Sequence, residues 1–140
     1  MTGDGAAWER TQMGSGAPWE PIAGYSRVVR VGPHVFVAGT TATNPDGHVV
    51  GVGDPEMQTR QTIQNIERAL ESVGARLTDV VRTRIYVVDI LRWEAVARVH
   101  GEVFGDIRPV TAMVQVSRLI APEMLVEIEA DAILTPQTEE

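Results

Sequence analysis

One amphipathic helix restricts the folds open to this chain more than any other segment. Asp54-Pro55-Glu56 has the composition of a helix start: Asp can cap the free N–H groups, Pro fits the first helical position and Glu complements the helix dipole. The helix is predicted to run to about Val73 and to end at Gly74. Apolar side chains recur along it at helical spacing: Ile63, Ile66, Ala69, Leu70 and Val73. This stripe requires a sheet or a second helix to cover it.

The segment before this helix has the pattern of a β-hairpin. Residues 27–31 and 34–38 are short β-branched runs separated by Gly32-Pro33. Asn44-Pro45-Asp46-Gly47 predicts a further turn, because Pro fixes φ and Gly accepts the left-handed conformation. A third short strand over 48–50 is a candidate continuation.

The segment after the helix predicts three more strands and a second helix. Residues 80–90 form a β-rich run, residues 92–104 have helical apolar spacing before Gly105 and Pro109, and strands follow over 110–116 and 124–134. The order β-β-(β)-α-β-α-β-β has too few βα repeats for a doubly wound sheet. It predicts an α+β sandwich, one mixed sheet with two helices on one face.

The second face of this sheet is predicted to meet a partner. It carries Tyr86 and Val88, with Met113 as a candidate third apolar residue. Arg82 and Arg84 share one strand face, and Glu127, Glu129 and Asp131 share another. If these strands are neighbours, their charges can pair across the open face.

Length and composition limit the classes of protein. The 140 residues suit a single domain over 21–135, with a loose N-terminal segment over 1–20 that contains a possible edge strand, and a tail over 136–140. The chain has no Cys, no apolar leader and no apolar run of membrane-spanning length, so we expect a cytoplasmic protein that does not enter a membrane. A net charge of -7 disfavours nucleic acid as a partner.

Several separate runs share a pattern with one known family. They are Gly24-Tyr25-Ser26, residues 36–39, 61–66, 81–89 and 108–116, and finally 125–130. Together they resemble the signature of the YjgF/RidA family, which is also called endoribonuclease L-PSP-like, over about residues 24–132. The resemblance implies a chorismate-mutase-like subunit, a homotrimer, and a small-molecule pocket at each subunit interface. It also implies hydrolysis of reactive enamines and imines.

The resemblance assigns roles to five positions, and only two keep the family's residue. Tyr25 matches a Tyr that lines the family's pocket, and Glu127 matches the Glu that positions or activates the hydrolytic water. Ala38 stands where the family often has a pocket Ser, and Ala97 where it often has a pocket Asn. Thr111 stands at the position of the Arg that grips the substrate carboxylate. The resemblance therefore implies a retained pocket with a changed ligand.

Loss of that Arg has a large predicted effect on carboxylate binding. Removing one partner of a buried charged pair costs roughly 2–5 kcal/mol, and a Thr hydroxyl supplies one short neutral donor in its place. Two other arginines are candidates to contact the ligand. Arg84 lies on a predicted strand, and Arg108 lies three residues before Thr111, where Pro109 favours a loop.

Each candidate residue also has a plain structural interpretation. Glu127 could pair with Arg82 or Arg84, Tyr25 could be a half-buried strand-edge aromatic residue, and Thr111 could be a simple β-former. The three histidines lack ligand spacing, so no metal is expected. The chain also lacks a glycine-rich nucleotide motif, and no cofactor is expected.

Three functions are compatible with these residues. The leading hypothesis is a homotrimeric hydrolytic deaminase of a reactive imine or enamine with altered selectivity, in which Glu127 is catalytic. In it Tyr25 lines the pocket, and Thr111, with Arg84 or Arg108 nearby, selects the ligand. The alternative is a non-catalytic small-molecule-binding protein, favoured by the joint changes at Ala38, Ala97 and Thr111. Endoribonuclease activity is the least favoured, because of the acidic charge.

Overall fold

A single mixed sheet forms the centre of the molecule. The computed structural model describes residues 7–136, and its six strands lie in the order β1-β2-β3-β6-β4-β5. All neighbouring strands are antiparallel except β4 and β5, which are parallel. The bounds are β1 Arg10–Met13, β2 Val28–Val31, β3 His34–Thr40, β4 Val80–Val87, β5 Val110–Gln115 and β6 Val126–Ile133.

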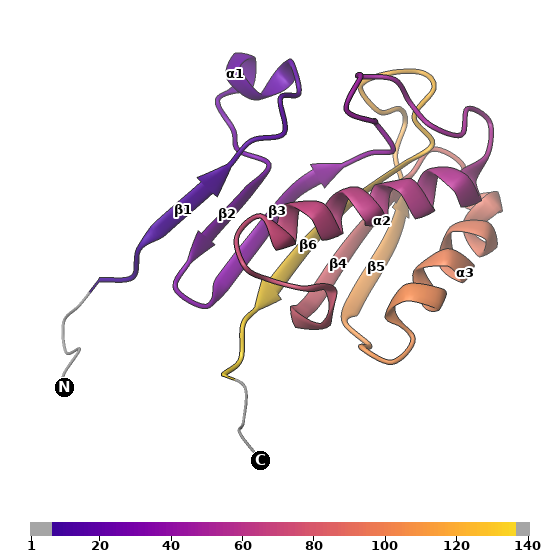
Figure 1. Ribbon diagram of the computed structural model, residues 1–140. Coiled ribbons are helices and arrows are strands. Elements are labelled where there is room, and N and C mark those ends of the chain that lie inside the picture. Colours follow the sequence, from indigo (N-terminus) through magenta and orange to yellow (C-terminus); the bar gives the residue numbers. More distant parts are fainter. Residues whose placement is uncertain (1–6, 137–140) are drawn as a thin grey trace.

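Two long helices cover one face of this sheet (Figure 1). They are α2 (Pro55–Glu71) and α3 (Trp93–Phe104), which pack against each other, and α2 also packs on β3 and β6. A short helix α1 (Trp19–Ala23) follows β1, and 3-10 turns occupy Leu77–Asp79 and Ile90–Arg92. The predicted α+β sandwich is confirmed.

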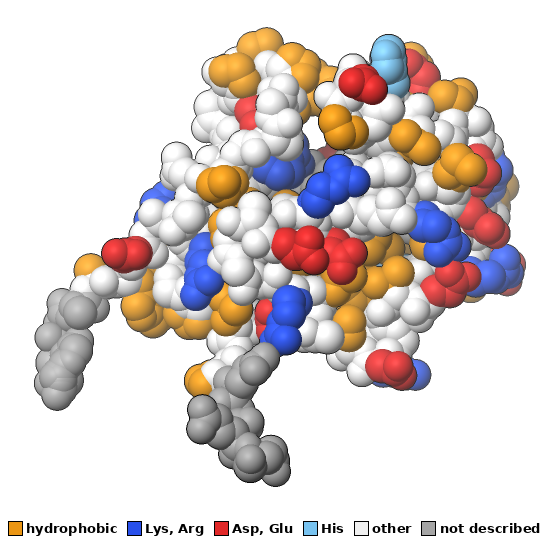
Figure 2. Space-filling view, in the orientation of Figure 1, with side chains coloured by type: hydrophobic (Ala, Val, Ile, Leu, Met, Phe, Trp, Pro, Cys, Tyr) orange, Lys and Arg blue, Asp and Glu red, His pale blue; other side chains and the backbone are white. Residues whose placement is uncertain are grey.

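The ends and the buried stripe of α2 follow from its sequence. Asp54 caps the helix by accepting from the Met57 amide at 3.1 Å, and Gly74 adopts a left-handed φ of 84° after its last turn. Ile63, Ile66 and Leu70 are buried against the sheet. Charged side chains of both signs lie on the outer surface of the helix layer (Figure 2), where Arg60 pairs with Glu102 at 3.0 Å.

The strands β4 and β6 alternate between a buried face and an open face. In β6 the residues 126, 128, 130 and 132 are buried under the helices, so Glu127, Glu129 and Asp131 lie on the open face. The register places Arg84 opposite Glu129, and Arg84 lies 3.9 Å from Glu129 and 3.3 Å from Asp131. The predicted charge pairing across the open face is confirmed for Arg84 with Glu129 and Asp131.

A β-bulge interrupts β3 where it runs beside β6. Val37 pairs with Ala130 and Thr40 pairs with Ile128, so Ala38 and Gly39 together oppose Glu129. Val37 and Thr40 are both buried although their sequence separation is odd. The extra residue therefore turns the Gly39 carbonyl group out of the regular ladder.

Four predictions about the elements need comment. The third strand over 48–50 is wrong, because this segment contributes only an isolated bridge between Thr43 and Val49. Met113 is not on the open face, since it packs against the core beneath the helices. The possible edge strand is present as β1, while α1 was not predicted.

Residues 137–140 of the predicted tail lie outside the described residues. Within 7–136, no helix has the length and apolar character to cross a membrane.

Candidate functional site

The predicted site residues fall on two sides of one sheet. Glu127 is paired with Tyr86 on the open face, and Thr111 is paired with Thr83. Residues 83 and 86 are an odd number apart on β4, so their side chains point to opposite faces. Glu127 and Thr111 of one chain therefore cannot contact the same small ligand through the sheet.

Glu127 is a partly buried carboxylate beside the bulge in β3. Its Oε2 occupies the space that a Cβ on Gly39 would need, so only Gly permits this approach. Burial raises the pKa of Glu127, the charge of Glu129 raises it further, and Arg27 opposes both. Among the residues that the structure describes, Glu127 makes no ion pair with Arg82 or Arg84, so that structural interpretation is wrong.

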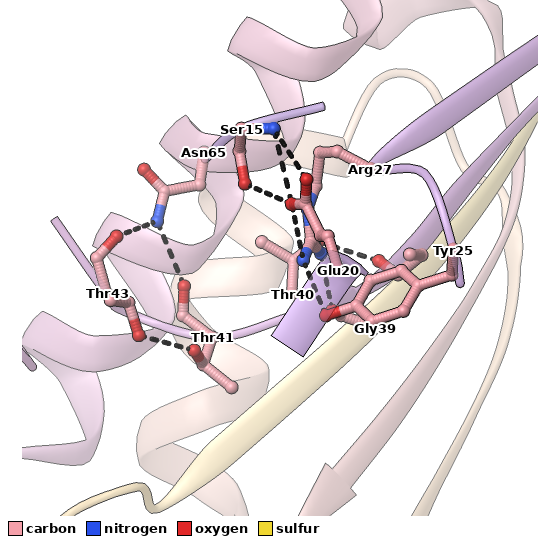
Figure 3. Close-up of polar contacts among 10 residues, drawn as sticks. Ser15, Glu20, Tyr25, Arg27, Gly39, Thr40, Thr41, Thr43 and Asn65 are labelled. Atoms are coloured by element: carbon pink, nitrogen blue, oxygen red, sulfur yellow. Dashed lines mark hydrogen bonds and ion pairs between the residues drawn. The ribbon is translucent and has the colours of Figure 1, made fainter. Parts of the chain in front are cut away.

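Arg27 brings a nearly buried cation to this end of the open face (Figure 3). Its side chain is 13% exposed. It donates to the Gly39 carbonyl oxygen at 2.6 Å and to Thr40 Oγ1 at 3.2 Å. The guanidinium thus binds the bulge that also accommodates the Glu127 carboxylate.

Glu20 of α1 holds Arg27 from the other side. Its Oε2 lies 3.6 Å from Arg27 Nη2 and accepts from Ser15 Oγ at 2.5 Å, and its Oε1 accepts from the Ser15 amide at 3.1 Å. Burial by itself raises the pKa of Glu20, but the Ser15 hydroxyl and amide and the Arg27 charge together hold this pKa below its ordinary value. The N-terminal segment is therefore tied to the site through a buried ion pair.

Tyr25 and Ala38 lie beside the same cation. The Tyr25 hydroxyl accepts from Arg27 Nη2 at 3.4 Å, and the guanidinium carbon lies 5.6 Å from the centre of the Tyr25 ring. Both residues line a shallow basin of about 470 Å3 on the open face, together with Phe36, Arg84 and Asp131. Three predicted ligand-binding residues, Tyr25, Ala38 and Arg84, are thus brought together by one chain.

The second half of the predicted site lies between β5 and α3. Thr83 Oγ1 donates to Thr111 Oγ1 at 2.7 Å and lies 2.9 Å from His100 Nε2. Burial lowers the pKa of His100, which favours the neutral imidazole. Ala97 is one helical turn before His100 on the same side of α3.

The two arginines proposed near Thr111 are engaged elsewhere in the chain. Arg84 pairs with Glu129 and Asp131 on the face opposite to Thr111. Arg108 lies in the turn before β5 with a φ of 58°, and its Nε donates to the Gly105 carbonyl oxygen at 2.9 Å. Within residues 7–136 of one chain, neither guanidinium is hydrogen-bonded to Thr111.

The described residues contain no group of His, Asp and Glu side chains that could hold a metal ion.

The sequence matches the Endoribonuclease L-PSP family model over residues 15–134. The chain belongs to this family. It is similar to Rv2704 of Mycobacterium tuberculosis, described as a member of the YjgF/YER057c/UK114 family: 55% identity, coverage of 90% of this chain and 100% of that chain, and a TM-score of 0.81. The YjgF gene product of E. coli is 28% identical, with coverage of 88% of this chain and 97% of that chain and a TM-score of 0.76. A RutC family protein of Pyrococcus abyssi is 38% identical over 113 residues, 81% of this chain and 88% of the relative.

In this YjgF-family chain, four residues that lie in the two halves of the site are not predicted from the sequence: Glu20, Arg27, Thr83 and His100. Arg27 and Glu20 lie 12 and 19 residues before Gly39 in the sequence, and only the bulge and α1 bring them together. Thr83 lies in the strand predicted over 80–90 and His100 in the helix predicted over 92–104, and the sequence assigns neither of them a role in the site. One sequence feature could have indicated the Thr83–His100 contact. Thr83 is a polar residue on the buried face of a β-branched strand, and the helix that covers this face carries His100.

Proposed function

We propose that this YjgF-family chain forms a homotrimer that hydrolyses the C=N bond of a small imine, or of the imine tautomer of an enamine, at each subunit interface. The observation that carries the proposal is the environment of Glu127, a carboxylate that is partly desolvated beside Gly39 and has a raised pKa. Carboxyl groups tuned in this way suit proton transfer near neutral pH.

The division of the site between two faces supports the interface. Glu127, Tyr25 and Ala38 lie on the open face, whereas Thr111 and Ala97 lie on the helix side at the sheet edge. A pocket containing both sets requires the edge of a second copy to meet the open face of the first. That face also exposes apolar side chains, with Phe36 50%, Val110 58% and Val114 48% exposed.

The chemical step needs only water and the substrate. The Glu127 carboxylate orients a water molecule and accepts its proton while the water oxygen bonds to the C=N carbon. The Glu127 carboxyl group then gives this proton to the nitrogen. As the C–N bond breaks, the remaining O–H proton of the carbinol passes to the nitrogen through Glu127, and a carbonyl compound and ammonia leave. General-base help of this kind is worth about 10²–10⁴ in rate.

Substrate selection follows from residue 111. Without a guanidinium there, a carboxylated imine loses a charged hydrogen bond, so the preferred imine lacks the carboxylate. Tyr25 forms an aromatic wall of the pocket beside Arg27.

The test is ammonia release from 2-iminopropanoate and from uncharged imines, each generated in place. Wild type is expected to hydrolyse an uncharged imine, Glu127→Gln to abolish the reaction, and Thr111→Arg to shift preference toward 2-iminopropanoate. Full activity of Glu127→Gln removes that residue from the mechanism. A monomeric mass in solution would contradict a pocket formed between subunits.

A non-catalytic binding role is the second candidate, because Ala38, Ala97 and Thr111 all lack the polar groups that the family often has there. In that case wild type is inert toward every imine, and Thr111→Arg gains activity only toward carboxylated ones. Endoribonuclease activity, named in the family's description, is opposed by the net charge of -7.

A further inference from the structure

Three side chains form a hydrogen-bonded chain that ends at Thr111. His100 lies on α3, Thr83 on β4 and Thr111 on the edge strand β5. The Nε2–Oγ1 distance from His100 to Thr83 is 2.9 Å, and the Oγ1–Oγ1 distance from Thr83 to Thr111 is 2.7 Å. Thr83 is fully buried at 0% exposure, whereas Thr111 is exposed. The chain therefore leads from the interior to the surface at the edge of the sheet.

The donors and acceptors that these side chains offer determine the direction of the two hydrogen bonds. Thr83 has one hydroxyl proton and donates it to Thr111. Thr83 must then accept from His100, which requires the tautomer with the proton on Nε2. Thr111 accepts the hydrogen bond from Thr83, so its own hydroxyl proton is available to a ligand. Successive bonds polarise one another, which strengthens Thr111 as a donor.

The hydrogen-bonded series that ends at Thr111 contains no charged side chain. Burial lowers the pKa of the His100 imidazole, which favours its neutral form. Within residues 7–136, the hydrogen bonds that link His100, Thr83 and Thr111 involve no guanidinium, ammonium or carboxylate group. A neutral donor of this kind complements a carbonyl oxygen, whereas a carboxylate that leaves water needs a cation or several donors.

We propose that the His100–Thr83–Thr111 chain makes Thr111 a dedicated donor to an uncharged carbonyl oxygen of the ligand, so that the substrate class is imines with an amide or ketone group in place of a carboxylate. This inference rests on the proposed interface site, to which Thr111 contributes from the second subunit. Thr83 and His100 are positioning residues, because they act on the ligand through Thr111.

The test compares a stable pair of ligands that differ at one group. 2-Oxopropanamide and 2-oxopropanoate are titrated into the assembled protein, and binding is followed by NMR of the Thr111 and His100 signals. Wild type is expected to bind the amide about tenfold more tightly than the acid, the value of one good hydrogen bond. Thr83→Val keeps the buried shape and is expected to lose most of this preference, while Thr83→Ser retains it.

The imidazole nitrogens give an independent readout. In wild type the 15N shifts of His100 should report a proton on Nε2, and Thr83→Val should change the tautomer ratio, which loss of packing alone does not do. Should wild type bind the acid as tightly as the amide, bind neither ligand, or keep its preference in Thr83→Val, the inference is overturned. Amide preference without ammonia release from any imine sustains the inference in a binding role and rejects the proposed hydrolysis.

Discussion

Arg27 and Glu127 meet at Gly39. Arg27 donates to the Gly39 carbonyl oxygen at 2.6 Å, and the Glu127 carboxylate fills the space where any other residue would place its Cβ. The β-bulge that frees this carbonyl group also brings the two charged side chains to one point of the open face. One backbone feature thus positions both a cation and the proposed catalytic carboxylate.

Gly39→Ala should therefore displace the Glu127 carboxylate. Misplacement of a catalytic group by about 1 Å costs on the order of 10²-fold in rate, so kcat/KM for an uncharged imine should fall by about that factor. Steady-state ammonia release measures the effect.

Glu127→Ala provides the control for this collision. The free energy of unfolding should drop in Gly39→Ala, but adding the same change to Glu127→Ala should cost much less, because the carboxylate that it meets is absent. Equal costs in the two backgrounds would show that residue 39 acts on stability without Glu127.

Removal of the Arg27 charge should move the pH dependence of the site upward. Arg27 lowers the pKa of Glu127 against the larger effects of burial and Glu129. In Arg27→Gln this pKa rises, so ionised Glu127 appears at higher pH and the acidic limb of the kcat/KM profile shifts the same way. Carbon-13 NMR titration of the Glu127 carboxyl group measures the change without any turnover.

Arg27→Lys is the matched variant, because it keeps the charge and loses only the planar guanidinium. Its Glu127 titration should remain close to that of wild type. A similar upward shift in both variants would assign the effect to packing around Gly39.

The main elements of the fold were predictable because they depend on local periodicity. The stripe of α2 and the alternation in β4 and β6 each repeat over enough residues to be recognised. The helix α1 has only five residues, too few to show a period, and the strand expected over 48–50 has a single bridge partner. Met113 was placed on the wrong face because the register of β5 against β4 is set by tertiary pairing.

The candidate site was predictable only where a resemblance named a position. Glu127 and Tyr25 were identified in this way, and the structure brings Tyr25 beside Arg27. Arg27 itself could not be inferred, since its role depends on a bulge that inserts one residue into β3. Likewise, Thr83 and His100 are 17 residues apart, and their contact depends on how α3 packs over β4.

Glu20→Gln should destabilise the protein in a pH-dependent manner. The folded pKa of Glu20 lies below its ordinary value of 4.5, so its ionised form contributes stability above that pH and loses the contribution as pH falls through the folded pKa. At pH 7 the loss should be roughly 1.5–3 kcal/mol, because hydrogen bonds to a charged group and a buried ion pair are removed. Urea unfolding at pH 7 and pH 3 measures it, and an equal loss at both pH values would contradict the ion-pair origin.

Thr62→Val should stabilise the protein. Thr62 is 0% exposed, and its Oγ1 is the one buried side-chain polar atom within 7–136 that lacks a hydrogen-bond partner. Valine has the same shape and removes the desolvation cost, a gain of about 1 kcal/mol in the free energy of unfolding. Thr59→Val is the matched control on the same helix, since Thr59 Oγ1 donates to the Pro55 carbonyl oxygen at 2.7 Å. Thr59→Val should give no gain, and a gain in both would trace the effect to helix packing.

Mixed assemblies should test whether the two halves of the site belong to different subunits. Glu127→Gln removes the catalytic carboxylate from the open-face half of the site. Thr111→Glu replaces the hydroxyl group of the edge half with a negatively charged carboxylate. Each variant alone should therefore be inactive. If the halves meet between subunits, random exchange of the two variants produces interfaces with an intact Glu127 from one chain and an intact Thr111 from the other.

About a quarter of the interfaces in an equal mixture should be intact, so ammonia release should recover to roughly that fraction of the wild-type rate after unfolding and refolding together. Mixing without subunit exchange is the control and should recover nothing. Because Glu127 and Thr111 lie on opposite faces of the sheet, a site within one chain would leave every chain in the mixture defective. Absence of recovery after confirmed exchange would therefore reject the shared interface site itself.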